Sequence, residues 1–135
     1  MPLSIQHRPK FRIPYKRIHE EVLGKSYNLS LAFVDKKTSK TLNKKYRGKD
    51  YPTNVLSFPL EKDAGEVIID LETAEEESDK FGMSVKNFVI YLFIHALLHL
   101  KGMRHGATME RTEKELCKLY GATHKSRHRH RDITD

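Results

Sequence analysis

The chain has 135 residues, which is enough for one domain that buries its own core without disulfides or a structural metal. Its single cysteine, Cys117, excludes an internal disulfide, and the first ten residues lack the apolar run of a secretory signal, so we expect a protein of the reducing cytoplasm. The formal net charge of +7 favours a polyanionic partner such as nucleic acid, while the longest apolar run, residues 88–100, is too short to span a bilayer.

The first half of the chain predicts two strands and two helices. Residues 3–6 form a short strand, and residues 14–23 form an amphipathic helix. Residues 27–34 alternate apolar and polar side chains before becoming apolar, which is typical of a strand with one well-buried face. A short helix over residues 37–46 follows, and Gly48 lies where such a helix would end.

The next segment predicts a β-hairpin. Residues 55–60 and 65–71 are both rich in β-branched and large apolar side chains, with turn-forming residues between them. Pro59 lies near the end of the first of these strands and favours an edge position, because proline cannot donate to a neighbouring strand. Residues 73–81 then predict an acidic helix on the surface.

The last third of the chain predicts a central helix and a covering helix. Residues 85–101 are apolar nearly all round, which is typical of a helix buried at the centre of its domain, and Ser84 is its expected N-cap. The final helix is predicted over residues 107–120. Its expected apolar anchors are Met109, Leu116, Leu119 and Tyr120, and Cys117 is expected only to pack among them.

These elements predict one α/β (α+β) domain. We expect a small mixed sheet of about four strands, packed with helices around the buried central helix. Residues 1–120 would form this single domain. Residues 121–135 are polar, rich in histidine and arginine and without apolar periodicity, so we expect them to be a mobile tail.

Three histidines on and just after the central helix predict a metal site. His95 and His99 are four residues apart, so their side chains project from the same helix face. Gly102 permits a sharp turn that can return His105 to that face. Three imidazoles with an open fourth position are typical of a catalytic zinc site, although Ni²⁺ or another ion also suits three imidazoles.

The same histidines allow two other interpretations. Each could be an ordinary core histidine, but burying three imidazoles without partners would cost a few kcal/mol, and a shared metal removes much of that penalty. The spacing also equals that of the metzincin peptidases, H-E-x-x-H-x-x-G-x-x-H. Ala96 stands where those enzymes carry their glutamate general base, so peptide hydrolysis by that route is not expected.

The histidine stretch resembles the signature of the YbeY family, the bacterial rRNA-maturation endoribonucleases. The family usually carries H-G-x-L-H-L-x-G-Y-D-H, and this chain has H-A-L-L-H-L-K-G-M-R-H. Two further stretches are similar to family blocks: L-N-K-K-Y-R-G-K-D-Y-P-T-N-V-L-S-F-P at residues 42–59 and G-E-V-I-I-D at residues 65–70. The departures from the usual residues are Ala96 for glycine, Met103 and Arg104 for tyrosine and aspartate, and Asn54 and Glu66 for aspartate.

The resemblance implies one zinc ion held by His95, His99 and His105, with a functional arginine at Arg47 facing the metal across a cleft. A guanidinium can fork onto two phosphate oxygens and stabilise the charge that develops there. The alternative for Arg47 is a basic side chain favoured by a helix C-terminus. Ser57 and Lys49 are candidate substrate-binding residues, and Ser57 could equally be a strand residue satisfied by its neighbours.

The expected function is a single-strand-specific endoribonuclease of 16S rRNA 3′-end maturation and ribosome quality control. Its partners would be rRNA and the 30S subunit, with a ribosomal protein or a ribosome-associated GTPase as further candidates, and neither a membrane nor DNA. Two alternatives stay open: a non-cleaving ribosome-assembly factor whose zinc is structural, and a zinc hydrolase of another substrate class. Within the candidate tail, residues 124–131 could track an RNA backbone or simply be a solvated end.

Overall fold

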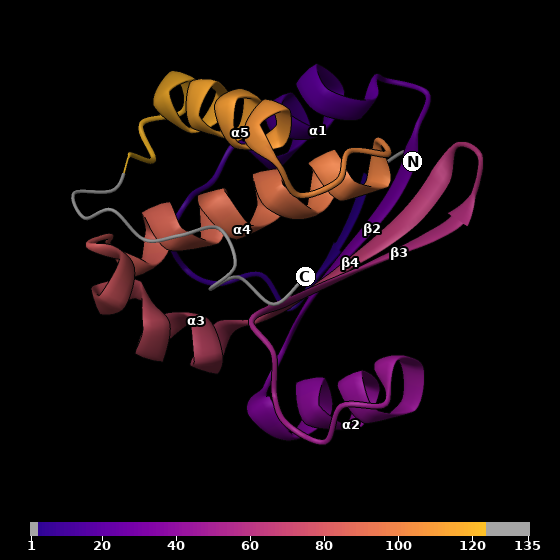
Figure 1. Cartoon of the computed structure of the whole chain (residues 1–135), viewed down its shortest axis with the longest axis vertical. Coiled ribbons are helices and arrows are strands. Elements are labelled where there is room, and N and C mark those ends of the chain that lie inside the picture. Colours follow the sequence, from indigo (N-terminus) through magenta and orange to yellow (C-terminus); the bar gives the residue numbers. More distant parts are fainter. Residues whose placement is uncertain (1–2, 124–135) are drawn as a thin grey trace.

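The computed structural model describes residues 3–123 and contains a four-stranded sheet covered by helices (Figure 1). The strands are β1 (Leu3–Gln6), β2 (Asn28–Val34), β3 (Val55–Glu61) and β4 (Ala64–Asp70). The helices are α1 (Tyr15–Leu23), α2 (Lys36–Arg47), α3 (Leu71–Glu77), the 3₁₀ helix η1 (Ser78–Phe81), α4 (Val85–Leu100) and α5 (Ala107–Leu119). The predicted mixed α/β domain is therefore confirmed.

The sheet combines parallel and antiparallel pairs. Its strand order is β1-β2-β4-β3, in which β1 and β4 both run parallel to β2. The last pair, β3 and β4, is the predicted antiparallel hairpin, with a register irregularity between Pro59 and Glu61. This places β3 at one edge of the sheet, where a proline is tolerated because no further strand needs its missing N–H group.

The two faces of the sheet carry different helices. Alternation along the strands sends Val55, Val67 and Ile69 to the face that packs against α4. Phe58 points to the opposite face, where its ring lies 5.3 Å from the ring of Tyr46 near the end of α2. Figure 1 shows α2 on one side of the sheet and α1, α4 and α5 on the other.

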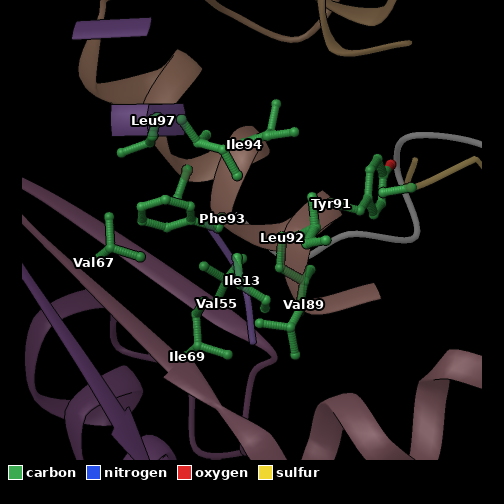
Figure 2. Packing of buried hydrophobic residues seen from close by; sticks show 14 of the residues in the cluster. Ile13, Val55, Val67, Ile69, Val89, Tyr91, Leu92, Phe93, Ile94 and Leu97 are labelled. Atoms are coloured by element: carbon green, nitrogen blue, oxygen red, sulfur yellow. The ribbon is translucent and has the colours of Figure 1, made fainter. Parts of the chain in front are cut away.

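Helix α4 forms the centre of the domain, as predicted. The Ser84 hydroxyl accepts a hydrogen bond from the Asn87 N–H at 3.1 Å and caps its first turn. Its residues from Phe88 to Leu98 are all buried. Figure 2 shows Phe93 pointing from α4 toward the strands while Tyr91 points away from them. Within residues 3–123 no single helix is long and apolar enough to cross a membrane; only α3–η1 and α4 together, bent by 104°, reach that length and hydropathy.

The acidic helix differs from its predicted range, residues 73–81, at its start and in its last turn. It begins at Leu71 rather than at residue 73, because the Asp70 side chain accepts the Thr73 N–H at 2.9 Å and acts as the N-cap. Its last residues tighten into η1, and Gly82, with a left-handed φ of 64°, caps the end of η1.

The C-terminal helix differs from expectation in one anchor. Leu119 is 65% exposed and anchors nothing, whereas Cys117 is buried in the core, as expected. Packing also continues past residue 120, since Ala122 is fully buried and its N–H donates to the Cys117 carbonyl at 2.7 Å. The remainder of the predicted tail, residues 124–135, lies outside the described residues.

Candidate metal centre

The end of α4 and the turn after it bring the three histidines together. Gly102 adopts a left-handed φ of 106°, and its N–H donates to the His99 carbonyl at 3.0 Å. The next N–H, from Met103, donates to the Leu98 carbonyl at 3.0 Å. These two bonds fold the chain back along α4, so that His105 reaches the face that carries His95 and His99, as the spacing predicted.

The three imidazoles form one compact cluster. Their ring centroids are 4.6 Å apart for His95 and His99, 4.6 Å for His99 and His105, and 5.2 Å for His95 and His105. One ring nitrogen from each lies within 4.8 Å of the other two. His95 is fully buried, His99 is half-buried and His105 is exposed, so the cluster extends from the core to the surface. Such a gradient leaves one side of the cluster open to a ligand.

Hydrogen bonds fix the orientation of two of these rings. Nδ1 of His95 donates to Oε2 of Glu113 at 2.8 Å. Nδ1 of His99 donates to the carbonyl oxygen of Met103 at 3.1 Å. With the proton on Nδ1 in each ring, the lone pair of each Nε2 is available, and the two Nε2 atoms are 3.2 Å apart.

This donor set fits a tetrahedral metal ion. Two nitrogen ligands at the usual zinc distance of about 2.0–2.1 Å, separated by a tetrahedral angle, would be about 3.3 Å apart. The observed 3.2 Å agrees with that value. Two lone pairs that converge at this distance repel each other unless a cation lies between them. Within residues 3–123 the group comprises His95, His99 and His105 and no fourth histidine, cysteine or carboxylate.

Sequence reasoning missed the carboxylate that supports the cluster. Glu113 is 4% exposed and lies on the buried face of α5 between Met109 and Cys117, four residues away on each side. A charged residue at the apolar spacing of an amphipathic helix was the available signal. Burial raises the pKa of the Cys117 thiol, and the negative charge of Glu113 adds to the effect, so this cysteine stays protonated and inert.

Tyr91 belongs to the same buried group. Its hydroxyl hydrogen-bonds the Glu113 carboxylate, and its ring centroid is 6.4 Å from that of His95. Burial, and then the charge and hydrogen bond of Glu113, raise the pKa of Tyr91. The phenol therefore remains protonated and acts as a hydrogen-bond donor.

The predicted substrate-binding residues lie around the edge strand. Ser57 is half-buried on β3 and, two residues after Val55, faces the same side of the sheet as α4. Arg47 is the last residue of α2, and Lys49 follows in the next loop; both are exposed. The structure thus brings the three histidines together, and Arg47 ends the helix α2, which lies on the other side of the sheet from α4 (Figure 1).

A buried polar network holds the loop that follows Arg47. Asp70 at the end of β4 accepts the hydroxyls of Ser39 and Thr73, each at 2.6 Å. The Asp70 N–H donates to the Asn54 carbonyl at 3.0 Å, which attaches the end of the loop to the sheet. Asn43 of α2 donates through Nδ2 to the carbonyl of Tyr51 at 2.8 Å, which attaches its middle. The loop backbone is therefore fixed relative to α2 and β4.

Packing bears on two residues of these motifs. Ala96 is fully buried within the core, so a glutamate of the metzincin type at this position would be a buried charge rather than a base open to substrate. Asn54 is 1% exposed and donates through Nδ2 to Oε1 of Glu77 at 2.9 Å. Burial raises the pKa of Glu77, and the bond from Asn54 opposes that shift.

Comparisons with known proteins agree with this architecture. The family model described as Endoribonuclease YbeY matches residues 10–122. The chain is 32% identical over 127 residues to the Endoribonuclease YbeY of Bacillus licheniformis, covering 79% of this chain and 80% of that protein. It is 40% identical over 111 residues to that of Thermoanaerobacter sp., covering 68% and 69%.

A solved structure has the same fold. The solution structure of TM1509 from Thermotoga maritima superposes with a TM-score of 0.63 at 27% identity, covering 86% of this chain and 87% of that one. The family model spans all of the chain except its two ends and includes all three histidines and Arg47. The resemblance inferred from the motifs is confirmed: this chain belongs to the endoribonuclease YbeY family.

Proposed function

We propose that this protein is a zinc-dependent endoribonuclease that cuts single-stranded RNA during 3′-end maturation of 16S rRNA. The observation that carries the proposal is the three-imidazole cluster, in which hydrogen bonds turn two Nε2 atoms toward a common point. Family membership supports the reaction type, because the matched relatives are named endoribonucleases. The net charge of +7 supports an RNA substrate, since each phosphate contact releases counterions.

His95, His99 and His105 would hold the ion. When bound, it would supply Lewis acidity toward a phosphoryl oxygen or a water molecule at the scissile bond. The burial gradient of the cluster orients the open side of the site toward solvent, where His105 lies. The buried side, at His95 and Glu113, excludes water and keeps the ligand geometry fixed.

Arg47, Lys49 and Ser57 would bind the RNA backbone. The Arg47 guanidinium can fork onto two phosphate oxygens and stabilise the negative charge that develops during cleavage, and the exposed Lys49 adds a second cation nearby. Ser57 can donate its hydroxyl proton to a phosphate oxygen from the α4 side of the sheet. The fixed loop backbone after Arg47 keeps these groups in a constant relation to β3.

The direct test is cleavage of a single-stranded RNA by the full chain. We expect His99→Ala and Arg47→Ala each to lower the rate by at least a hundredfold, because each removes a group acting on the transition-state charge. Arg47→Lys keeps the charge but not the fork and should recover only part of the rate. Lys44→Ala, an exposed basic residue in the same turn of α2, is the matched control. If His99→Ala and Arg47→Ala cleave like the parent, the assignment is wrong.

The ends of the products distinguish two routes of cleavage. Attack by water leaves a 5′-phosphate or a 3′-phosphate, whereas attack by the RNA's own 2′-hydroxyl leaves a 2′,3′-cyclic phosphate. The same assay separates the enzyme from a non-cleaving assembly factor with a structural zinc. Such a factor would yield no metal-dependent product from the parent chain, and His99→Ala would destabilise its fold because a structural zinc contributes directly to folding.

The cellular role follows from the substrate. Cleavage of 16S rRNA places the protein in the cytoplasm with the 30S subunit, and with a ribosomal protein or a ribosome-associated GTPase as recruiting partner. A role in ribosome quality control would follow from cleavage of defective subunits. The role in maturation is tested by depleting the protein in cells and measuring the 3′ end of 16S rRNA, with cells supplied with His99→Ala as control. Normal 3′ ends after depletion would refute the assigned pathway.

A further inference from the structure

The strongest unexplained feature of the molecule is a carboxylate buried behind the metal cluster. Glu113 is 4% exposed on α5, and its neighbours on that face are the buried Met109 and Cys117. An isolated carboxylate in such a place would be strongly destabilising, so it needs partners that compensate for lost water. The neighbours one turn away on its own helix cannot supply them, because one is a thioether and the other a protonated thiol.

Two partners of Glu113 lie on α4. Nδ1 of His95 donates to its Oε2 at 2.8 Å, and the Tyr91 hydroxyl donates a second hydrogen bond. Tyr91 and His95 are four residues apart and therefore project from the same face of that helix. Figure 2 shows that Tyr91 points away from the strands. One carboxylate thus joins two adjacent turns of the metal-bearing helix to α5.

The bond to Glu113 determines which nitrogen of His95 is available. With Nδ1–H donated to the carboxylate, only Nε2 can be a ligand, and it lies 3.2 Å from Nε2 of His99. His99 is oriented in the same way, but by the neutral carbonyl of Met103. Glu113 alone of these two acceptors brings negative charge, which would partly offset the charge of a divalent ion.

We infer that Glu113, held in place by Tyr91, is a positioning residue for the metal: it orients His95 and raises the affinity of the site for divalent cations. The inference rests on the metal site of the proposed function. It is independent of the RNA substrate, so metal binding rather than cleavage tests it. Carboxylates that orient a ligating imidazole typically change metal affinity by about 10–100-fold when they are removed.

The experiment compares the full chain with Glu113→Gln and Tyr91→Phe. The matched control is Glu115→Gln, an exposed glutamate on the same helix. Zn²⁺ affinity is measured by competition with a chromophoric chelator, and the visible spectrum of the Co²⁺-loaded protein reports ligand geometry. Thermal unfolding of each metal-free variant is recorded alongside. We expect Glu113→Gln to weaken Zn²⁺ binding at least tenfold and to alter the Co²⁺ spectrum, and Tyr91→Phe to weaken binding by a smaller factor.

Two results would overturn the inference. One is a Glu113→Gln variant that binds Zn²⁺ less than tenfold more weakly than the parent, which would make Glu113 a purely structural residue. The other applies if Glu113→Gln does not fold: a folded Tyr91→Phe with parental Zn²⁺ affinity and Co²⁺ spectrum would then refute the role. If the parent chain itself fails to bind Zn²⁺ or Co²⁺, the proposed function fails together with the inference. If the parent chain cleaves RNA and the variants bind Zn²⁺ as tightly as the parent, the inference alone is wrong.

Discussion

Replacing Gly65 with alanine tests how closely β4 packs against Tyr27 and the end of α4. Gly65 is buried in β4, within the stretch G-E-V-I-I-D. A Cβ built there meets both methyl carbons of Leu100 at 3.0 Å and the hydroxyl oxygen of Tyr27 closer still. Leu100 is half-buried and can move, but Tyr27 is 7% exposed and its ring is packed in the core. The tyrosine therefore produces most of the penalty.

The expected net effect is a loss of stability. Inserting a methyl group into a packed site costs about 1–3 kcal/mol. Alanine also restricts the unfolded chain, which stabilises the protein by roughly 0.5–1 kcal/mol. The difference leaves Gly65→Ala less stable by about 1–2 kcal/mol, which lowers the melting temperature by roughly 5 °C for a domain of this size. Urea unfolding of the metal-free chain measures the first quantity and calorimetry the second.

A double-mutant cycle with Tyr27→Phe identifies the cause. Removing the hydroxyl removes the nearest atom, so Gly65→Ala should cost about 1 kcal/mol less in the Tyr27→Phe background than in the parent. Tyr27→Phe alone is the control for any other role of that hydroxyl. The reasoning fails if Gly65→Ala is as stable as the parent, or if its cost is the same in both backgrounds.

Three further substitutions have definite expected outcomes. Burial raises the pKa of Tyr15 to about 12. As the pH rises past about 10, the Tyr15 phenol therefore loses its proton in the unfolded chain before it does so in the folded protein, and the free energy of unfolding falls by as much as about 3 kcal/mol up to about pH 12. Between about pH 8 and about pH 11, Tyr15→Phe should lose less unfolding free energy than the parent in urea titrations, and an equal loss would contradict the assignment. Asn54→Asp places a second carboxylate against Glu77 and should destabilise the folded protein at neutral pH by about 1–3 kcal/mol. Part of this stability should return as the pH falls and Glu77 is protonated, and a destabilisation that does not change with pH would refute the charge argument. Asp70→Asn replaces one of two accepting oxygens with a donor and should cost about 2 kcal/mol in urea unfolding, whereas a neutral effect would show that the network does not hold the loop.

The histidine cluster was predictable because its determinants are local. Helix α4 is apolar around its whole circumference, and the four-residue spacing of His95 and His99 places them on one helix face. Gly102 permits the turn that returns His105 to that face. The hairpin of β3 and β4 was equally predictable from two stretches rich in β-branched and large apolar residues, separated by a short turn. Local periodicity and turn chemistry suffice when the interacting residues are near each other in sequence.

Other parts of the site depend on contacts between distant segments. From composition alone, Glu113 is expected to be an exposed charge on a polar helix; only its spacing of four residues from Met109 and from Cys117 indicates that it lies on the buried face. The position of Arg47 depends on which face of the sheet α2 covers, and no local motif around Arg47 specifies that face. The exposure of Leu119 likewise follows from how α5 is rotated against α4. Sequence patterns define such residues only after the topology is known.

The two halves of the proposed catalytic apparatus come from separate stretches of the chain. The ion ligands and the groups behind them all fall between residues 91 and 113, on one helical hairpin, whereas the RNA-binding candidates fall between residues 47 and 57. Evolution can therefore alter one property while preserving the other. A homologue that kept the first stretch and lost the second would still load its cation, yet it would have no hold on a nucleic acid, and metal content alone would not identify a working nuclease.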